Sequence, residues 1–233
     1  MAIVIPVKRL FTPLLRRIYC AFAIFCAVYY AFPPIQRSAW NKDRLYKRML
    51  AGDKLEKGAA AADLAAIGAQ DVLLKALKSD SDTTREMAAN ALMDLWFNAS
   101  GDQALTLLQA SGQALEQHEF VEAMAILSRL VETYPFYAEG WNRRATVYWQ
   151  LGNVERAVAD CKKVVLLNPN HFAAWQSLGL GYMRLNDLPN AVKAFKSALR
   201  VIPHDRATRS YLRRCEDMQR RFRPQREPEG EMV

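Results

Sequence analysis

The side chains that could bind a metal or act as nucleophiles are few and dispersed in this sequence. No two cysteines have the two-residue spacing typical of zinc sites, and the histidines do not cluster beside them. We therefore expect no metal, and we interpret Cys161 as a small buried apolar residue. The residues considered are Cys20, Cys26, Cys161, Cys215, His118, His171 and His204.

Motifs of known catalytic mechanism are equally scarce. Gly179 and Gly181 match two glycines of a dinucleotide-binding fingerprint, but Arg184 occupies the place of the third. The sequence contains no GxxxxGK[ST], HExxH or GxSxG pattern. The sequence therefore predicts no catalytic residue, no cofactor and no enzyme, and it directs attention to binding.

The elements that could support binding follow from an internal repeat. Pro135, Pro169 and Pro203 stand 34 residues apart, and each follows an alanine by 12 positions. The alanines are Ala123, Ala157 and Ala191. A period of 34 is typical of stacked helix-turn-helix units, with proline ending each unit because it cannot continue a helix.

Large residues recur with the same period. Trp141 is followed by Tyr148, and Trp175 by Tyr182, seven residues on in each case. The stretches 141–169 and 175–203 resemble the tetratricopeptide repeat family, and 104–137 resembles it mainly in its second helix. The resemblance implies an all-α fold, an antiparallel helix-pair solenoid that winds into a right-handed superhelix. The residues themselves add an apolar N-terminal segment.

Five segments are predicted along the chain. The central one holds three repeats, and the region before it is helical but irregular, which we interpret as a degenerate repeat capping the N-terminal end of the stack. The last helix is expected to cap the other end, ahead of a polar, disordered tail. The boundaries are 1–40, 41–103, 104–205 (repeats 104–137, 138–171 and 172–205), 206–223 and 224–233.

The N-terminal segment is basic and apolar. Residues 1–42 contain six Lys or Arg and no acid, and residues 18–32 are uncharged. Fifteen helical residues span about 22 Å, less than the roughly 30 Å of a hydrocarbon core, so Arg16 and Arg17 would have to snorkel. We expect a transmembrane helix that anchors the chain to a membrane, in an organelle.

Three alternatives remain for this segment. It can be a removed targeting sequence, mitochondrial rather than plastid because Ser and Thr are few, which would leave a soluble protein. It can be the apolar region of a secretory signal, or a buried helix of the fold. Positive residues flank the run on both sides, so they do not predict its topology.

Positive charge is concentrated at the chain ends. Residues 43–205 carry a net charge of −1, whereas residues 1–42 carry +6 and residues 206–233 carry +3. This balance argues against nucleic-acid binding by the repeat body. The last helix could instead contact anionic lipid or RNA, or serve only as a solvated cap. The arginines concerned are Arg213, Arg214, Arg220 and Arg221.

By resemblance, the partner-binding surface is a concave groove lined by the first helix of each repeat. The matching positions are Asn142, Thr146, Trp149, Gln150, Gln176, Leu180, Met183 and Arg184. An exposed tryptophan in a groove is typical of a binding hot spot, although neighbouring helices could instead bury Trp149.

The family also grips the C-terminal carboxylate of chaperone tails with a Lys–Asn clamp. Its positions hold Leu108 and Gly112 in the first repeat and Asn142 and Thr146 in the second, so such tails are not the expected ligands. The sequence thus predicts a non-enzymatic, membrane-tethered scaffold for protein–protein interaction. The alternative is a structural subunit of a larger membrane or ribonucleoprotein complex.

Overall fold

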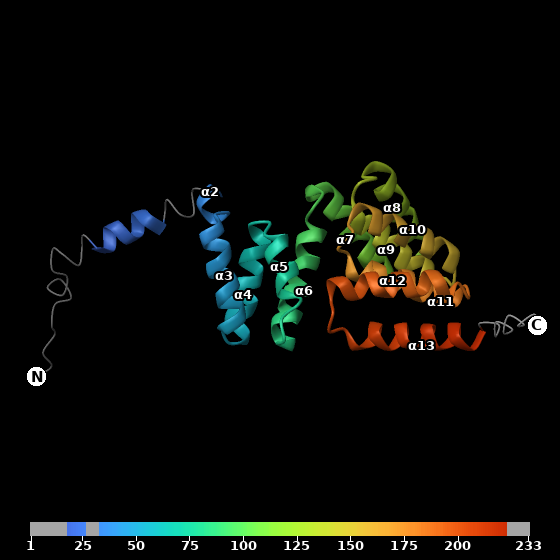
Figure 1. The fold of residues 1–233 in the computed structure, drawn as a ribbon. Helices are drawn as coiled ribbons and strands as arrows, with labels where there is room; N and C mark the ends of the chain where they lie inside the picture. Colours follow the sequence, from blue (N-terminus) through green and yellow to red (C-terminus); the bar gives the residue numbers. More distant parts are fainter. Residues whose placement is uncertain (1–17, 27–32, 223–233) are drawn as a thin grey trace, which may run out of the picture.

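The computed structural model describes residues 18–26 and 33–222. Within these residues all regular secondary structure is α-helical, as the sequence predicts (Figure 1). The helices from residue 33 on are α2 (Pro33–Gln36), α3 (Ala39–Ala51), α4 (Lys54–Ala66), α5 (Gln70–Ala76), α6 (Asp82–Phe97), α7 (Gly101–Glu116), α8 (Phe120–Thr133), α9 (Ala138–Gln150), α10 (Val154–Leu167), α11 (Phe172–Arg184), α12 (Leu188–Val201) and α13 (Arg206–Phe222).

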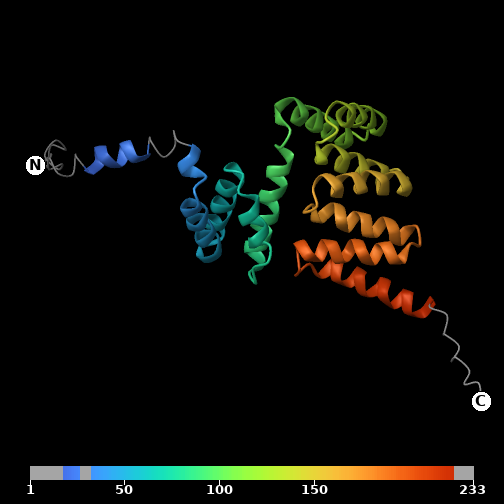
Figure 2. The ribbon, with the colours of Figure 1, turned by 45° about the horizontal axis from the view of Figure 1, so that its top comes forward.

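Helices α7 to α12 form three antiparallel pairs, α7 with α8, α9 with α10 and α11 with α12. The three pairs stack side by side in one layered array (Figure 2). Side chains cap the second helices of the last two pairs. The side chains of Asn153 and Asp187 accept hydrogen bonds from the backbone N–H groups of Arg156 and Asn190. The predicted helix-pair solenoid is confirmed.

Hydrogen bonds explain why tryptophan and proline recur together. The indole Nε1 of Trp141 donates to the carbonyl oxygen of Pro135 (3.0 Å), and that of Trp175 donates to Pro169 (2.8 Å). At the third proline, Arg209 takes the equivalent place and donates through Nη2 to Pro203 (2.7 Å). Helix α13 therefore starts like the first helix of a further repeat and packs against α12.

Two glycines of α11 allow close packing between helices. A Cβ atom on Gly179 would lie 2.5 Å from a ring carbon of Phe195 on α12. On Gly181 it would lie 2.3 Å from a methyl group of Val158 on α10. Both distances are too short for a methyl group, so α11 can sit between α10 and α12 only with glycine at these positions.

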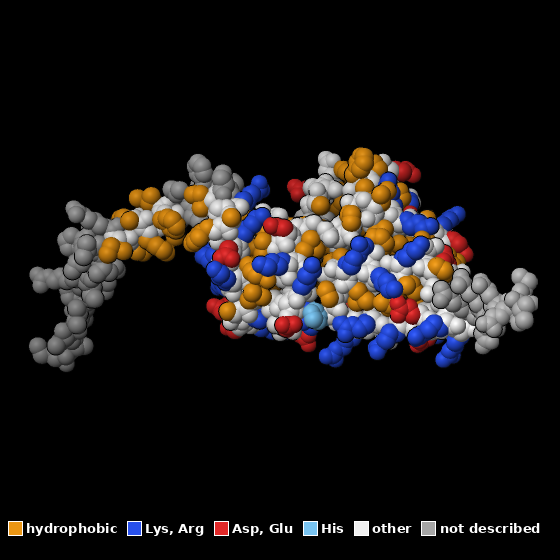
Figure 3. Space-filling model, in the orientation of Figure 1, with side chains coloured by type: hydrophobic (Ala, Val, Ile, Leu, Met, Phe, Trp, Pro, Cys, Tyr) orange, Lys and Arg blue, Asp and Glu red, His pale blue; other side chains and the backbone are white. Residues whose placement is uncertain are grey.

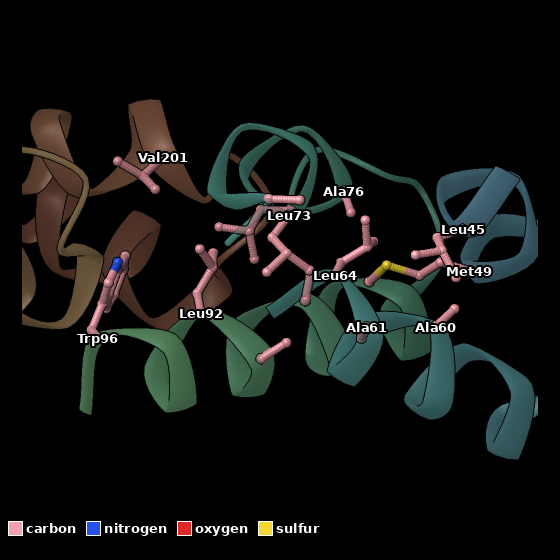
Figure 4. Close-up of a cluster of buried hydrophobic side chains, with 14 residues drawn as sticks. Leu45, Met49, Ala60, Ala61, Leu64, Leu73, Ala76, Leu92, Trp96 and Val201 are labelled. Carbon is pink, nitrogen blue, oxygen red and sulfur yellow. The ribbon is translucent and has the colours of Figure 1, made fainter. Parts of the chain in front are cut away.

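Helices α3 to α6 form a separate cluster around a core that includes Leu45, Leu73 and Leu92 (Figure 4). Trp96, at the C-terminal end of α6, joins this core to Val201 of the last repeat. Helix α6 packs against α4, α5 and α9, and it runs along one side of the stacked repeats (Figure 2).

The position of α6 corrects one expectation. We expected residues 41–103 to cap the N-terminal end of the stack, but α6 crosses its side. The physical reason is apolar contact, because Phe172 and Ile202, which belong to the last repeat, pack against the same core as Trp96.

The N-terminal apolar segment is described only in part. Residues 18–26 are helical and largely exposed, and Phe22 and Ile24 are each 64% accessible. No helix among the described residues is long and apolar enough to span a bilayer. Residues 27–32 of the predicted anchor, the leading residues 1–17 and the predicted tail 224–233 lie outside the described part of the chain.

Candidate protein-binding groove

The predicted groove residues lie on α9 and α11, and they differ in solvent exposure. Thr146, Gln150 and Arg184 are exposed. The other five are half-buried, namely Asn142, Trp149, Gln176, Leu180 and Met183.

On α9, Trp149 is partly packed into the protein. It lies against the apolar core around Val158 and Cys161, and a Cβ on Gly181 would be 3.7 Å from its Cζ2 atom. Trp149 is therefore neither fully exposed nor fully buried. One part of the indole fills the space between α9 and α11, and another part remains accessible. Thr146, one turn earlier, donates through Oγ1 to the carbonyl oxygen of Asn142 (3.1 Å) and is exposed.

On α11, three predicted groove residues hold the last helix in place. Nε2 of Gln176 donates to Oγ1 of Thr208 (3.0 Å) and to Oδ2 of Asp205 (3.4 Å). Leu180 and Met183 pack against the cluster that contains Phe195 and residues of α13. These three side chains are engaged within the chain, because α13 packs over the last repeat.

A buried polar pair joins the second and third repeats. Nε2 of His171 lies 2.7 Å from Oε1 of Glu139, and both side chains are fully buried. The backbone N–H of Ala174 donates to Nδ1 of His171 (3.1 Å), so Nε2 carries the proton and donates to Glu139. Nδ2 of Asn142 donates to the other oxygen of Glu139 (3.0 Å), which explains the orientation of this predicted groove residue.

An ion pair joins α9 to α10. Arg144 donates through Nε and Nη2 to the two oxygens of Asp160 (2.8 and 2.9 Å). This hydrogen bonding raises the pKa of the Arg144 guanidinium further. The guanidinium also lies 4.8 Å from the ring centre of Trp141, so the repeat tryptophan packs on a fixed cation.

The sequence did not predict a pocket that lies between α6 and the repeats. It lies where the end of α6 meets α7 and α9, and its volume is about 290 Å³. Its lining residues are Phe97, Asn98, Leu105, Leu108, Gln109, Gly112 and Arg143. Leu108 and Gly112 were noted in the sequence only as clamp positions without lysine or asparagine. The repeat pattern gave no indication that α6 would supply a wall.

The arginines singled out on α13 are all exposed. Lys and Arg side chains gather along the edge of the molecule where α13 lies (Figure 1 and Figure 3). Arg220 pairs with Asp217 on the same helix. Arg213, Arg214 and Arg221 make no ion pair within the described residues. The same residues contain no group of three or more potential metal ligands.

The stacked helix pairs and the accessible side chains on their first helices define a helical-repeat protein. The family model of the tetratricopeptide repeat matches residues 138–171. A TPR repeat-containing protein of Rhizobium etli is 29% identical over 143 residues, which are 61% of this chain and 70% of the relative. Residues 138–171 therefore match a tetratricopeptide repeat, and the chain is similar to proteins that contain such repeats.

Other similar proteins match smaller parts of this chain. The protein trd-1 of Caenorhabditis elegans is 31% identical over 86 residues, which are 37% of this chain and 11% of trd-1. Among solved structures, the first TPR of Spaghetti (RPAP3), bound to the HSP90 peptide SRMEEVD, has a TM-score of 0.48 and 23% identity. It covers 50% of this chain and 93% of that one. The Sgt2 TPR domain of Aspergillus fumigatus has a TM-score of 0.48, 20% identity and coverages of 56% and 88%.

Proposed function

We propose that this chain is a non-enzymatic scaffold that binds a segment of a partner protein along the first helices of its repeats. The observation that carries the proposal is the accessible row on α9, where Thr146 and Gln150 are exposed and Trp149 is half-buried, on the helix that also contributes Arg143 to the pocket. Rigid, preformed helices favour such binding because the receptor loses little conformational freedom when the partner docks.

A carboxylate grip on a chaperone tail is not part of this proposal. At the clamp positions Leu108 is buried and apolar, Gly112 has no side chain, and Asn142 is hydrogen-bonded to Glu139. The peptide SRMEEVD, which occurs in the RPAP3 complex, is the direct probe. We expect the full-length chain not to bind it, and saturable binding that is lost when its terminal carboxylate is amidated would contradict this part of the proposal.

The groove itself is tested by recovering partners with the tagged full-length chain from its own cells. Thr146→Glu places a charge on the accessible row without disturbing the core, because Thr146 is exposed. Leu166→Glu is the matched control, since Leu166 is 72% accessible on α10, the second helix of the same pair. The proposal predicts that partners are lost with Thr146→Glu and retained with Leu166→Glu.

The alternative of a structural subunit gives a different result in the same experiment. A subunit held by its ends would co-migrate with one assembly in wild type and in both variants. A scaffold would occur partly free, and only the Thr146→Glu variant would be wholly free. Trp149→Ala is less clean as a test, because this indole also contributes to the packing between α9 and α11.

A second function, contact with an anionic membrane surface, is favoured by the exposed arginines of α13 and by the exposed apolar helix at residues 18–26. RNA is the less favoured ligand, because single-stranded RNA is usually held by exposed aromatic rings, and Tyr211 of α13 instead stacks on Phe195. Sedimentation with phosphatidylserine vesicles tests this function. Replacing Arg213, Arg214, Arg220 and Arg221 by Gln should reduce binding, and equal binding to phosphatidylcholine vesicles would contradict it.

A further inference from the structure

The pocket between α6, α7 and α9 has walls from both parts of the chain. Phe97 and Asn98 come from the C-terminal end of α6, Arg143 comes from α9, and the remaining lining residues belong to α7. Tyr137 fixes the end of α6 in this position, because its hydroxyl donates to the carbonyl oxygen of Phe97 (2.5 Å). The pocket is therefore a built feature of the junction and not a property of the repeats alone.

The lining combines apolar side chains with one cation. Phe97, Leu105 and Leu108 supply the apolar part. The guanidinium of Arg143 lies 5.0 Å from the centre of the Phe97 ring and is half-buried. It forms no ion pair with an acidic residue of the described chain. A cation on an aromatic ring without an acidic partner is suited to a ligand that brings its own negative charge.

The size of the pocket limits what can fill it. Its volume of about 290 Å³ is at or below the lower end of the roughly 300–1,000 Å³ that sites for drug-sized molecules and cofactors occupy. One bulky side chain of a peptide is a better match than a free small molecule. Gly112 adds no side chain to the lining, and a Cβ atom there would meet nothing within 4 Å.

We propose that this pocket receives a single bulky apolar side chain of the bound partner segment, and that an Asp or Glu close to it in the partner pairs with Arg143. The inference rests on the proposed groove function and specifies its ligand as an apolar–acidic peptide segment. The partner is thereby selected partly by α6, which is not a repeat helix.

The test starts from a phage-displayed library of random peptides selected on the full-length chain. Enriched peptides are synthesised, and their affinities are measured for wild type, Gly112→Trp and Leu166→Trp. Gly112→Trp places an indole at the pocket, whereas Leu166→Trp adds the same side chain at an exposed position of α10 that does not line the pocket. We expect binding to weaken about tenfold or more with Gly112→Trp and to stay unchanged with Leu166→Trp. Arg143→Gln should also weaken binding of the enriched peptides, because their acidic residue loses its cationic partner.

The outcomes separate the two proposals. Peptides that bind Gly112→Trp as well as wild type but are lost with Thr146→Glu overturn the pocket and leave the groove function standing. Peptides that are insensitive to both variants, or failure to enrich any peptide, overturn both. Enriched peptides without an apolar residue next to an acidic one also overturn the pocket. Circular dichroism melts of each variant establish that a loss of binding is not a loss of folding.

Discussion

The indole of Trp96 lies on the imidazole of His171, with ring centroids 4.8 Å apart and planes 24° from parallel. Trp96 lies in the last turn of α6, and His171 is the N-cap residue of α11, the first helix of the third repeat. The same indole donates through Nε1 to Oε1 of Gln70 (2.9 Å) and is only 5% exposed. One side chain therefore couples the two parts of the chain.

Trp96→Ala should lower the free energy of unfolding by about 3–5 kcal/mol, because it removes a large buried ring at the junction. Trp40→Ala is the control, since Trp40 is 63% exposed, and it should change stability by no more than about 0.5 kcal/mol. Urea denaturation followed by circular dichroism measures both. Equal effects would mean that the junction is not held by Trp96.

Glu139→Ala should destabilise the protein by about 1–3 kcal/mol, because it leaves the Nε2–H of His171 buried without an acceptor. Glu139→Gln should cost less, since its amide oxygen can still accept from His171. Chemical denaturation of the two variants side by side checks the order. The reverse order would show that the carboxylate is not needed as the acceptor.

Two glycine substitutions should have opposite effects. Gly179→Ala places a methyl group against Phe195 and should cost about 1–3 kcal/mol. Gly112→Ala meets nothing within 4 Å and should stabilise the protein by about 0.5–1 kcal/mol, because alanine favours the helix. Thermal melts of the two variants test these opposite effects. A loss of stability in both would show that the space at Gly112 is not open.

Burial raises the pKa of the Cys161 thiol from 9.0 to about 12, with a smaller contribution from Asp160. Between these values the native thiol keeps its proton while the unfolded one ionises, so unfolding releases a proton. The contribution of Cys161 to stability is therefore fully present below pH about 9 and is lost as the pH rises toward 12. The stability difference between wild type and Cys161→Ala should narrow over this range. In native protein at neutral pH a thiol reagent should label Cys20, which is exposed, and leave Cys161 unlabelled.

The repeats could be predicted from sequence because their contacts are periodic. Trp141 and Trp175 bond to prolines six residues before them, so a local spacing carries the contact. Arg209 replaces the tryptophan, yet it also stands six residues after a proline and donates to the carbonyl oxygen of that proline.

The N-terminal half could not be placed in the same way. Alanine-rich helices fit many templates, and the position of α6 depends on contacts of Trp96 with His171 and Phe172 that are far away in sequence. For the same reason the pocket wall formed by Phe97 was not predicted. The contacts of Gln176, Leu180 and Met183 with α13 also depend on tertiary packing. The family pattern assigns these residues to the groove, and it does not indicate that a helix covers them.

The position of α6 has a practical consequence for dissecting the chain. A truncated protein that starts at Gly101 would retain every repeat, yet it would lack Phe97 and Asn98 and would uncover His171 and Phe172. Such a fragment would expose an apolar edge that the intact protein conceals, and it would tend to self-associate. Interaction screens with an isolated repeat fragment would therefore sample a surface that the whole molecule does not present.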